Sequence, residues 1–131
     1  MTLIEWTNEF VLGVPDVDRE HRELIELINT LHAGLYRGDS RRRVVERLGE
    51  MHALIAAHFA HEEAFMREIR YMAYAEHKED HEILLDDLRD IIAATEAAGQ
   101  LDHARLSADL DYWFSAHFRT HDARLHGKKP Y

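Results

Sequence analysis

The sequence predicts an all-α protein, an up-down-up-down antiparallel four-helix bundle preceded by an N-terminal arm. Four long stretches carry apolar residues at alternating spacings of three and four, which is the repeat of helices packed in a bundle. The only prolines, Pro15 and Pro130, lie near the two ends, and Gly38 and Gly99 fall between stretches. The segments that connect the four stretches are short, which favours antiparallel packing of neighbouring helices. The length suits one domain over 1–131.

The elements follow in order along the chain. Residues 1–17 do not follow the helical repeat and form the arm, which Trp6, Phe10 and Val14 would pack over the bundle. The first helix is expected over about 18–37. Its core-facing positions are His21, Leu24, Ile28, Leu31 and Leu35. The second helix is expected over about 40–69. Its core-facing positions are Val44, Leu48, Met51, Ile55, His58, Glu62 and Phe65.

The third and fourth helices complete the bundle. The third is expected over about 74–98. Its core-facing positions are His77, His81, Leu84, Leu88, Ile91 and Thr95. The fourth is expected over about 102–125. Its core-facing positions are Leu106, Leu110, Trp113 and His117. These positions account for most of the apolar residues, so we expect a monomer.

Composition excludes several classes of protein. The formal net charge of −9 argues against a nucleic-acid or anionic-membrane partner. The absence of cysteine excludes disulfides, zinc–thiolate sites, iron–sulfur clusters and thiol catalysis. No apolar run approaches 18 residues and no signal-peptide core is present, so the expected location is the cytoplasm. Eleven histidines are many more than a core of this size needs.

Seven polar residues occupy core positions of these helices and predict one metal site. They form a lone histidine followed by HxxxE, HxxxH and HxxxxD motifs. The seven are His21, His58, Glu62, His77, His81, His117 and Asp122. In the up-down-up-down topology all seven fall at one end of the bundle. Buried histidines satisfied by hydrogen bonds are the structural alternative, but such a polar layer is costly without a cation.

The mixed imidazole and carboxylate set suits a dinuclear iron centre, although ligand type alone leaves manganese, zinc and copper open. His117 and Asp122 are five residues apart, so a π-bulge is expected between them to turn both toward the core. The alternative ligand at this end is His121. The remaining histidines are expected at the surface or behind the ligands, with His61 facing outward and His52 half-buried. These histidines are His32, His52, His61, His103, His121 and His126.

Over nearly its full length the chain resembles the bacterial hemerythrins. The resemblance rests on Ile4, Trp6, the run 13–18, Glu20-His21, Leu27-Ile28-Asn29, Leu31-His32, His58-Phe59, Glu62-Glu63, Tyr71, His77-Lys78, His81, Trp113, His117 and Asp122. One departure is Arg70, where the family often has glycine before Tyr71, so the preceding helix is expected to end without its usual cap. A second is Arg119, which follows Phe118 near the expected pocket.

The resemblance implies a division of the ligands between two irons. One iron would take His77, His81 and His117, and the other His21 and His58. Glu62 and Asp122 would bridge them, together with an oxo or hydroxo group. Three histidines and three bridges make six ligands, whereas two histidines and three bridges make five. The open sixth position would bind dioxygen.

The implied function is reversible dioxygen binding at a non-heme di-iron centre for storage, delivery or scavenging, without enzymatic activity. The irons would pass from ferrous to ferric as dioxygen binds, in a dry apolar pocket. Candidate pocket residues are Leu24, Phe59, Trp113, Phe114 and Phe118. Plain core packing is the alternative for all five, and it carries equal weight for the last two. An unidentified client, such as an oxidase or a methane or respiratory enzyme, would receive the dioxygen. The alternatives are an oxygen or redox sensor acting through a separate partner, and a di-iron oxidase or peroxidase.

Overall fold

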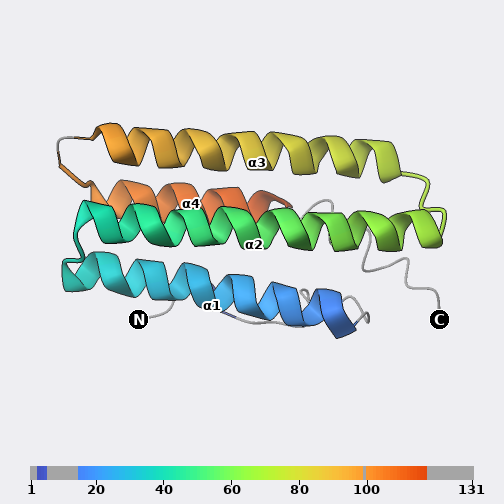
Figure 1. The fold of residues 1–131 in the computed structure, drawn as a ribbon, viewed down its shortest axis with the longest axis horizontal. Helices are drawn as coiled ribbons and strands as arrows, with labels where there is room; N and C mark the ends of the chain where they lie inside the picture. Colours follow the sequence, from blue (N-terminus) through green and yellow to red (C-terminus); the bar gives the residue numbers. More distant parts are fainter. Residues whose placement is uncertain (1–2, 6–14, 99, 118–131) are drawn as a thin grey trace.

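Four helices form an antiparallel bundle in the computed structural model, which describes residues 3–5, 15–98 and 100–117, and of His117 the backbone only. The helices are α1 (Pro15–Arg37), α2 (Arg41–Glu68), α3 (Tyr74–Ala97) and α4 (His103–His117). Each helix runs opposite to the one before it (Figure 1). Helix α2 packs on α1 and α3, and α4 packs on the same two helices. The described residues contain no strand, so the predicted all-α bundle is confirmed.

Helix α1 begins at Pro15, earlier than the expected start at Asp18. A proline fits the first turn of a helix because its ring fixes φ near the helical value and its missing N–H would have no partner there. Asp16 and Asp18 place negative charge in the same turn, where the helix dipole favours it. Val17, assigned to the arm from the sequence, is therefore a buried helical residue, 1% exposed.

The turn between α2 and α3 corrects a second expectation. Arg70 has a φ of 53° and takes the left-handed conformation that glycine usually supplies. The Tyr71 N–H donates to the Met66 carbonyl at 2.9 Å, and the Arg70 N–H donates to the Arg67 carbonyl at 3.2 Å. These are the two hydrogen bonds of a Schellman motif, and Tyr71 packs against Met66 in an apolar cluster. The helix therefore closes with its full cap, at the conformational cost of a non-glycine residue.

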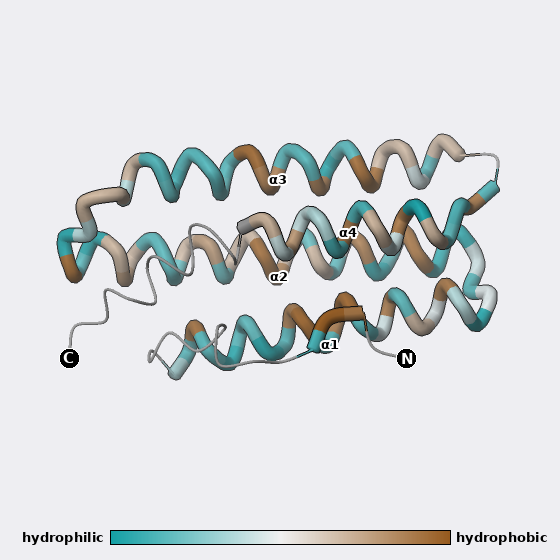
Figure 2. The backbone as a smooth tube through the Cα atoms, turned by 180° about the vertical axis from the view of Figure 1, so that it is seen from behind, coloured by the Kyte–Doolittle hydropathy of each residue, from teal (hydrophilic) through white to brown (hydrophobic). Residues whose placement is uncertain are grey.

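The core runs the length of the bundle between the four helices. Figure 2 shows apolar segments recurring among hydrophilic ones along each helix, as the sequence repeat predicts. The most deeply buried apolar side chains, each 0% exposed, are Leu24, Ile28, Leu31, Leu35, Leu48, Met51, Met66, Leu88 and Leu110. Among the described residues, no helix combines the length and hydropathy that a membrane span requires.

Asn29 of α1 fixes the described part of the arm, residues 3–5. Its Oδ1 accepts hydrogen bonds from the backbone N–H groups of Leu3 and Ile4, both at 2.9 Å. Its Nδ2 donates to the Ile4 carbonyl at 2.8 Å. Ile4 is 7% exposed and belongs to the main core cluster. The predicted packing of Trp6, Phe10 and Val14 lies outside the described residues.

Candidate metal centre

Two clusters of potential metal ligands share the carboxylate of Glu62. One comprises His21, His58 and Glu62, and the other comprises Glu62, His77 and His81. Helix α1 supplies His21, α2 supplies His58 and Glu62, and α3 supplies the last two histidines. His58 and Glu62 lie one helical turn apart on one face, as do His77 and His81. The antiparallel topology thus brings five of the seven predicted ligands to one level of the bundle.

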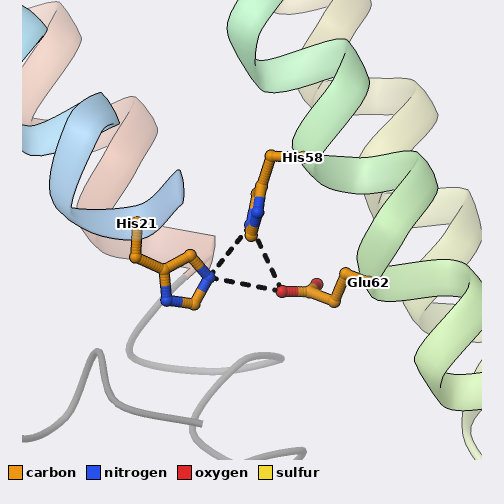
Figure 3. A group of neighbouring side chains, drawn as sticks. All are labelled: His21, His58 and Glu62. Carbon is orange, nitrogen blue, oxygen red and sulfur yellow. Dashed lines mark hydrogen bonds and ion pairs between the residues drawn. The ribbon is translucent and has the colours of Figure 1, made fainter. Parts of the chain in front are cut away.

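The first cluster forms a compact triangle between α1 and α2. The Nε2 atoms of His21 and His58 lie 2.9 Å apart. Glu62 Oε2 lies 3.5 Å from His21 Nε2 and 3.3 Å from His58 Nε2. Figure 3 shows these three side chains pointing toward one another from their two helices.

The second cluster uses the other oxygen of the same carboxylate. Glu62 Oε1 lies 2.9 Å from His77 Nε2 and 2.9 Å from His81 Nε2. Metal–nitrogen bonds of about 2.1 Å at right angles place neighbouring ligand atoms about 3.0 Å apart. The spacings in both clusters are therefore close to those of atoms that share an ion. Each oxygen of Glu62 faces one pair of histidines, which is the arrangement of a bridging carboxylate.

The hydrogen bond of the outer ring nitrogen of His81 is compatible with a cation in the second cluster. His81 Nδ1 donates to Glu63 Oε2 at 2.8 Å. In a neutral imidazole this leaves a lone pair on Nε2, which faces the carboxylate oxygen of Glu62. The contact of 2.9 Å between Nε2 and the carboxylate oxygen therefore requires a proton on both ring nitrogens or a metal ion between the two atoms. His81 and Glu62 are 1% and 0% exposed, so bulk solvent screens this contact little.

Glu20 plays the corresponding part in the first cluster. Its Oε1 accepts from His58 Nδ1 at 3.4 Å, and its Oε2 accepts from His61 Nδ1 at 2.6 Å. Burial alone would raise the pKa of Glu20, but the hydrogen bonds and positive charge of the two histidines outweigh burial and lower this pKa below its ordinary value. Glu20 and Glu63 belong to the family resemblance in the sequence, which implied no role for either. Their position next to the predicted ligands His21 and Glu62 was the available signal.

The predicted pocket residues line the same core, as far as they are described. Phe59 stacks on His81, with ring centroids 3.8 Å apart and an interplanar angle of 5°. Leu24 is 0% exposed and Phe114 2%. Trp113 donates from Nε1 to the Leu84 carbonyl at 2.9 Å, which ties α4 to α3. The Phe118 prediction lies outside the described residues.

The structure corrects the prediction for His32, which was expected at the surface or behind the ligands. His32 is 5% exposed, and its Nδ1 shares a hydrogen bond of 2.8 Å with Ser107 Oγ. It joins α1 to α4 in the apolar part of the core and has no place in either ligand cluster. His61 faces outward and His52 is half-buried, as predicted. His103 is also half-buried. Predictions for His121, His126 and Arg119 lie outside the described residues.

The last two predicted ligands are not described at the level of side chains. The backbone of His117 is helical and ends the described part of α4. Asp122, the alternative ligand His121 and the predicted π-bulge all lie outside the described residues.

Comparison with known proteins gives the class of protein. A model of the hemerythrin HHE cation binding domain matches residues 12–128. The chain therefore belongs to the hemerythrin family.

Several relatives resemble this chain over most of its length. The bacteriohemerythrin of Stenotrophomonas maltophilia is 30% identical over 93% of this chain and 78% of its own. The bacteriohemerythrin of Methylococcus capsulatus is 30% identical over 97% of this chain and 96% of its own. The myohemerythrin of Sipunculus nudus is 26% identical over 94% of this chain and 91% of its own. The resemblance inferred from the sequence is confirmed, and membership of this family supports oxygen binding at a di-iron centre.

Proposed function

We propose that this protein binds dioxygen reversibly at a non-heme di-iron centre. The observation that carries the proposal is the position of Glu62, whose two oxygens face two separate pairs of buried histidines. Imidazole and carboxylate ligands suit iron, and a carboxylate shared between two ions holds them close enough to act on one small molecule. When bound, the iron pair supplies the electrons that reversible dioxygen binding requires.

The proposed ligand division follows the two clusters. His77 and His81, with His117, would hold one iron, and His21 and His58 would hold the other. Glu62 and Asp122, with an oxo or hydroxo group, would bridge them. This division leaves one coordination position open at the iron with two histidines. The support for it is that the described ligands already separate into these two groups.

The surrounding residues would keep the site dry and the ligands in place. All five described ligands are at most 2% exposed. Leu24 and Phe59, proposed with Trp113, Phe114 and Phe118 as the pocket, offer no group that donates or accepts protons. An apolar wall of this kind excludes water, which slows loss of bound dioxygen and irreversible oxidation of the iron.

A di-iron oxidase or peroxidase is the second candidate, and the donor set favours the carrier. Oxygen-activating bundles use carboxylate-rich sites built from Glu-x-x-His motifs. This chain contains no such motif, and the proposed site has five histidines and two carboxylates.

We further propose that the protein acts as a monomer that supplies dioxygen to a separate client.

Iron content and optical spectra test the proposed function. The protein is loaded with ferrous iron anaerobically, exposed to dioxygen and then deoxygenated. Two irons per chain, with charge-transfer bands that appear with dioxygen and vanish on its removal, are expected. Glu62→Gln should bind fewer than two irons and show no reversible bands, because an amide nitrogen cannot bridge. Irreversible oxidation of the wild type would favour the enzyme, and a single bound iron would refute the di-iron site.

A further inference from the structure

The exposed residue His61 is connected to the buried histidine His58 through the carboxylate of Glu20. His61 has 57% of its side chain exposed, whereas Glu20 has 7% and His58 none. The two ring nitrogens donate to different oxygens of the one carboxylate, at 2.6 Å from His61 and 3.4 Å from His58. A continuous hydrogen-bonded chain therefore runs from the surface of α2 to the first ligand cluster.

The shorter of the two contacts is the one to the exposed histidine. A buried carboxylate with one firm partner is held where that partner lies. Because His58 Nδ1 is the more distant donor, the position of Glu20 relative to His58 depends on the anchor that His61 provides. At the second cluster the corresponding carboxylate, Glu63, bonds His81 Nδ1 at the shorter distance of 2.8 Å, so it has no need of a second anchor to hold it there.

We propose that His61 is a positioning residue for the ion held by His21 and His58. By anchoring Glu20, it keeps the carboxylate on His58 Nδ1, so that the Nε2 lone pair of His58 is aimed at the metal. A carboxylate behind a metal-binding histidine fixes its tautomer and ring orientation and makes it a stronger ligand. The inference rests on the proposed function. It adds that the iron with the open position is tuned from the protein surface through His61.

The matched variants are His61→Ala and His61→Asn. Alanine removes the donor, whereas asparagine carries its Nδ2 about where histidine carries Nδ1 and keeps the bond to Glu20. Neither change should unfold the protein, because the side chain is mostly exposed. Glu20→Gln removes the anchored carboxylate itself, and Glu63→Gln removes its counterpart at the other cluster.

The measurement is a calorimetric titration of metal-free protein with Co²⁺ at constant pH, resolving two dissociation constants. Glu20→Gln should weaken one of them by about 10- to 100-fold. His61→Ala should weaken the same one by about 3- to 10-fold, and His61→Asn should stay close to wild type. Glu63→Gln should weaken the other. In the Co²⁺-loaded protein, the hyperfine-shifted Nδ1–H resonance of His58 should exchange with water faster in His61→Ala than in His61→Asn.

Three results would overturn the inference. These are a His61→Ala protein with wild-type constants, a His61→Asn protein as weak as His61→Ala, and a loss that falls equally on both ions. The wild-type titration tests the proposed function separately. Fewer than two ions per chain would refute the di-iron site, whereas two ions with unaffected variants would refute only the role of His61.

Discussion

The ring of Phe59 lies parallel to the imidazole of His81, with centroids 3.8 Å apart and planes inclined by 5°. The contact restrains tilting of the imidazole out of its plane. The hydrogen bond from His81 Nδ1 to Glu63 restrains rotation within that plane. The two contacts together leave Nε2 directed at Glu62, with little freedom to turn away.

Phe59→Leu should loosen this arrangement. Losing the stacked ring is expected to cost about 1 kcal/mol of stability and to speed release of metal from the cluster of His77 and His81. Phe65→Leu is the matched control, because Phe65 is 7% exposed on the same helix but belongs to the cluster of Val17 and Met66. Urea denaturation and Co²⁺ release kinetics provide the two readouts. Equal release rates in the two variants would contradict a role for stacking.

Arg70→Gly should stabilise the protein by about 1 kcal/mol, because glycine adopts a positive φ without the clash that a Cβ atom causes. Arg70→Ala is the control, since alanine removes the exposed side chain but keeps the Cβ. The midpoint of urea denaturation should rise for glycine and stay near wild type for alanine. If both variants gained equally, the benefit would come from losing the arginine and not from the backbone.

Ser107→Ala should destabilise the bundle without affecting the metal centre. The change leaves the buried Nδ1 of His32 without its hydroxyl partner, which is expected to cost about 1–3 kcal/mol. Ser115→Ala is the comparison on the same helix, because Ser115 Oγ donates to the exposed Asp111, and its loss should change stability by less than about 0.5 kcal/mol. Both variants should bind as much iron as wild type. Reduced iron content in Ser107→Ala would link His32 to the site.

Asp87 provides a pH-dependent test on helix α3. Partial desolvation, with the neighbouring carboxylates of Asp90, Asp86 and Asp80, raises the pKa of Asp87 above its ordinary value. The folded protein therefore binds this proton more tightly than the unfolded chain does. The contribution of Asp87 to stability falls as pH rises from the unfolded pKa through the raised folded pKa.

Asp87→Asn should consequently be more stable than wild type at pH 7, by less than about 1 kcal/mol because the group is exposed to solvent. The difference should vanish near pH 3, where the carboxyl is protonated in both states. Thermal denaturation of metal-free protein at the two pH values provides the comparison. A gain that persisted at pH 3 would show that the charge of Asp87 is not its cause.

The helices and the convergence of the five described candidate ligands were predictable from the sequence because both depend on residue spacing. His58 and Glu62 lie one turn apart on the core-facing side of their helix, and any antiparallel neighbour must meet them there. The roles of Glu20 and Glu63 were not predictable in this way. Each lies one residue from a ligand, about 100° around its helix. Their roles depend on where the imidazole rings of His58 and His81 lie, because this decides whether the outer ring nitrogens come within hydrogen-bonding distance of the two carboxylates.

His32 shows a second limit of spacing arguments. It follows Leu31 directly, so the repeat of three and four places it beside the core-facing positions and not among them. The buried face of α1 is wider than that repeat, because α1 contacts both α2 and α4. A polar residue at the margin of such a face is buried when the neighbouring helix offers a partner, and Ser107 is that partner. The sequence alone does not reveal which marginal residues will find one.

The placement of Glu62 among four histidines, with the leucines of the core toward the other end of the bundle, has a consequence for how the protein opens. Without metal, close packing of the layer formed by Glu62 and the four histidines contributes little to stability, while the leucine-rich half remains packed as before. Amide hydrogens around His58 and His81 in the metal-free protein should therefore exchange through local opening, and those around Leu35 and Leu48 only through global unfolding. An incoming ion would then reach its ligands through one loosened end, with the opposite end holding the four helices in register.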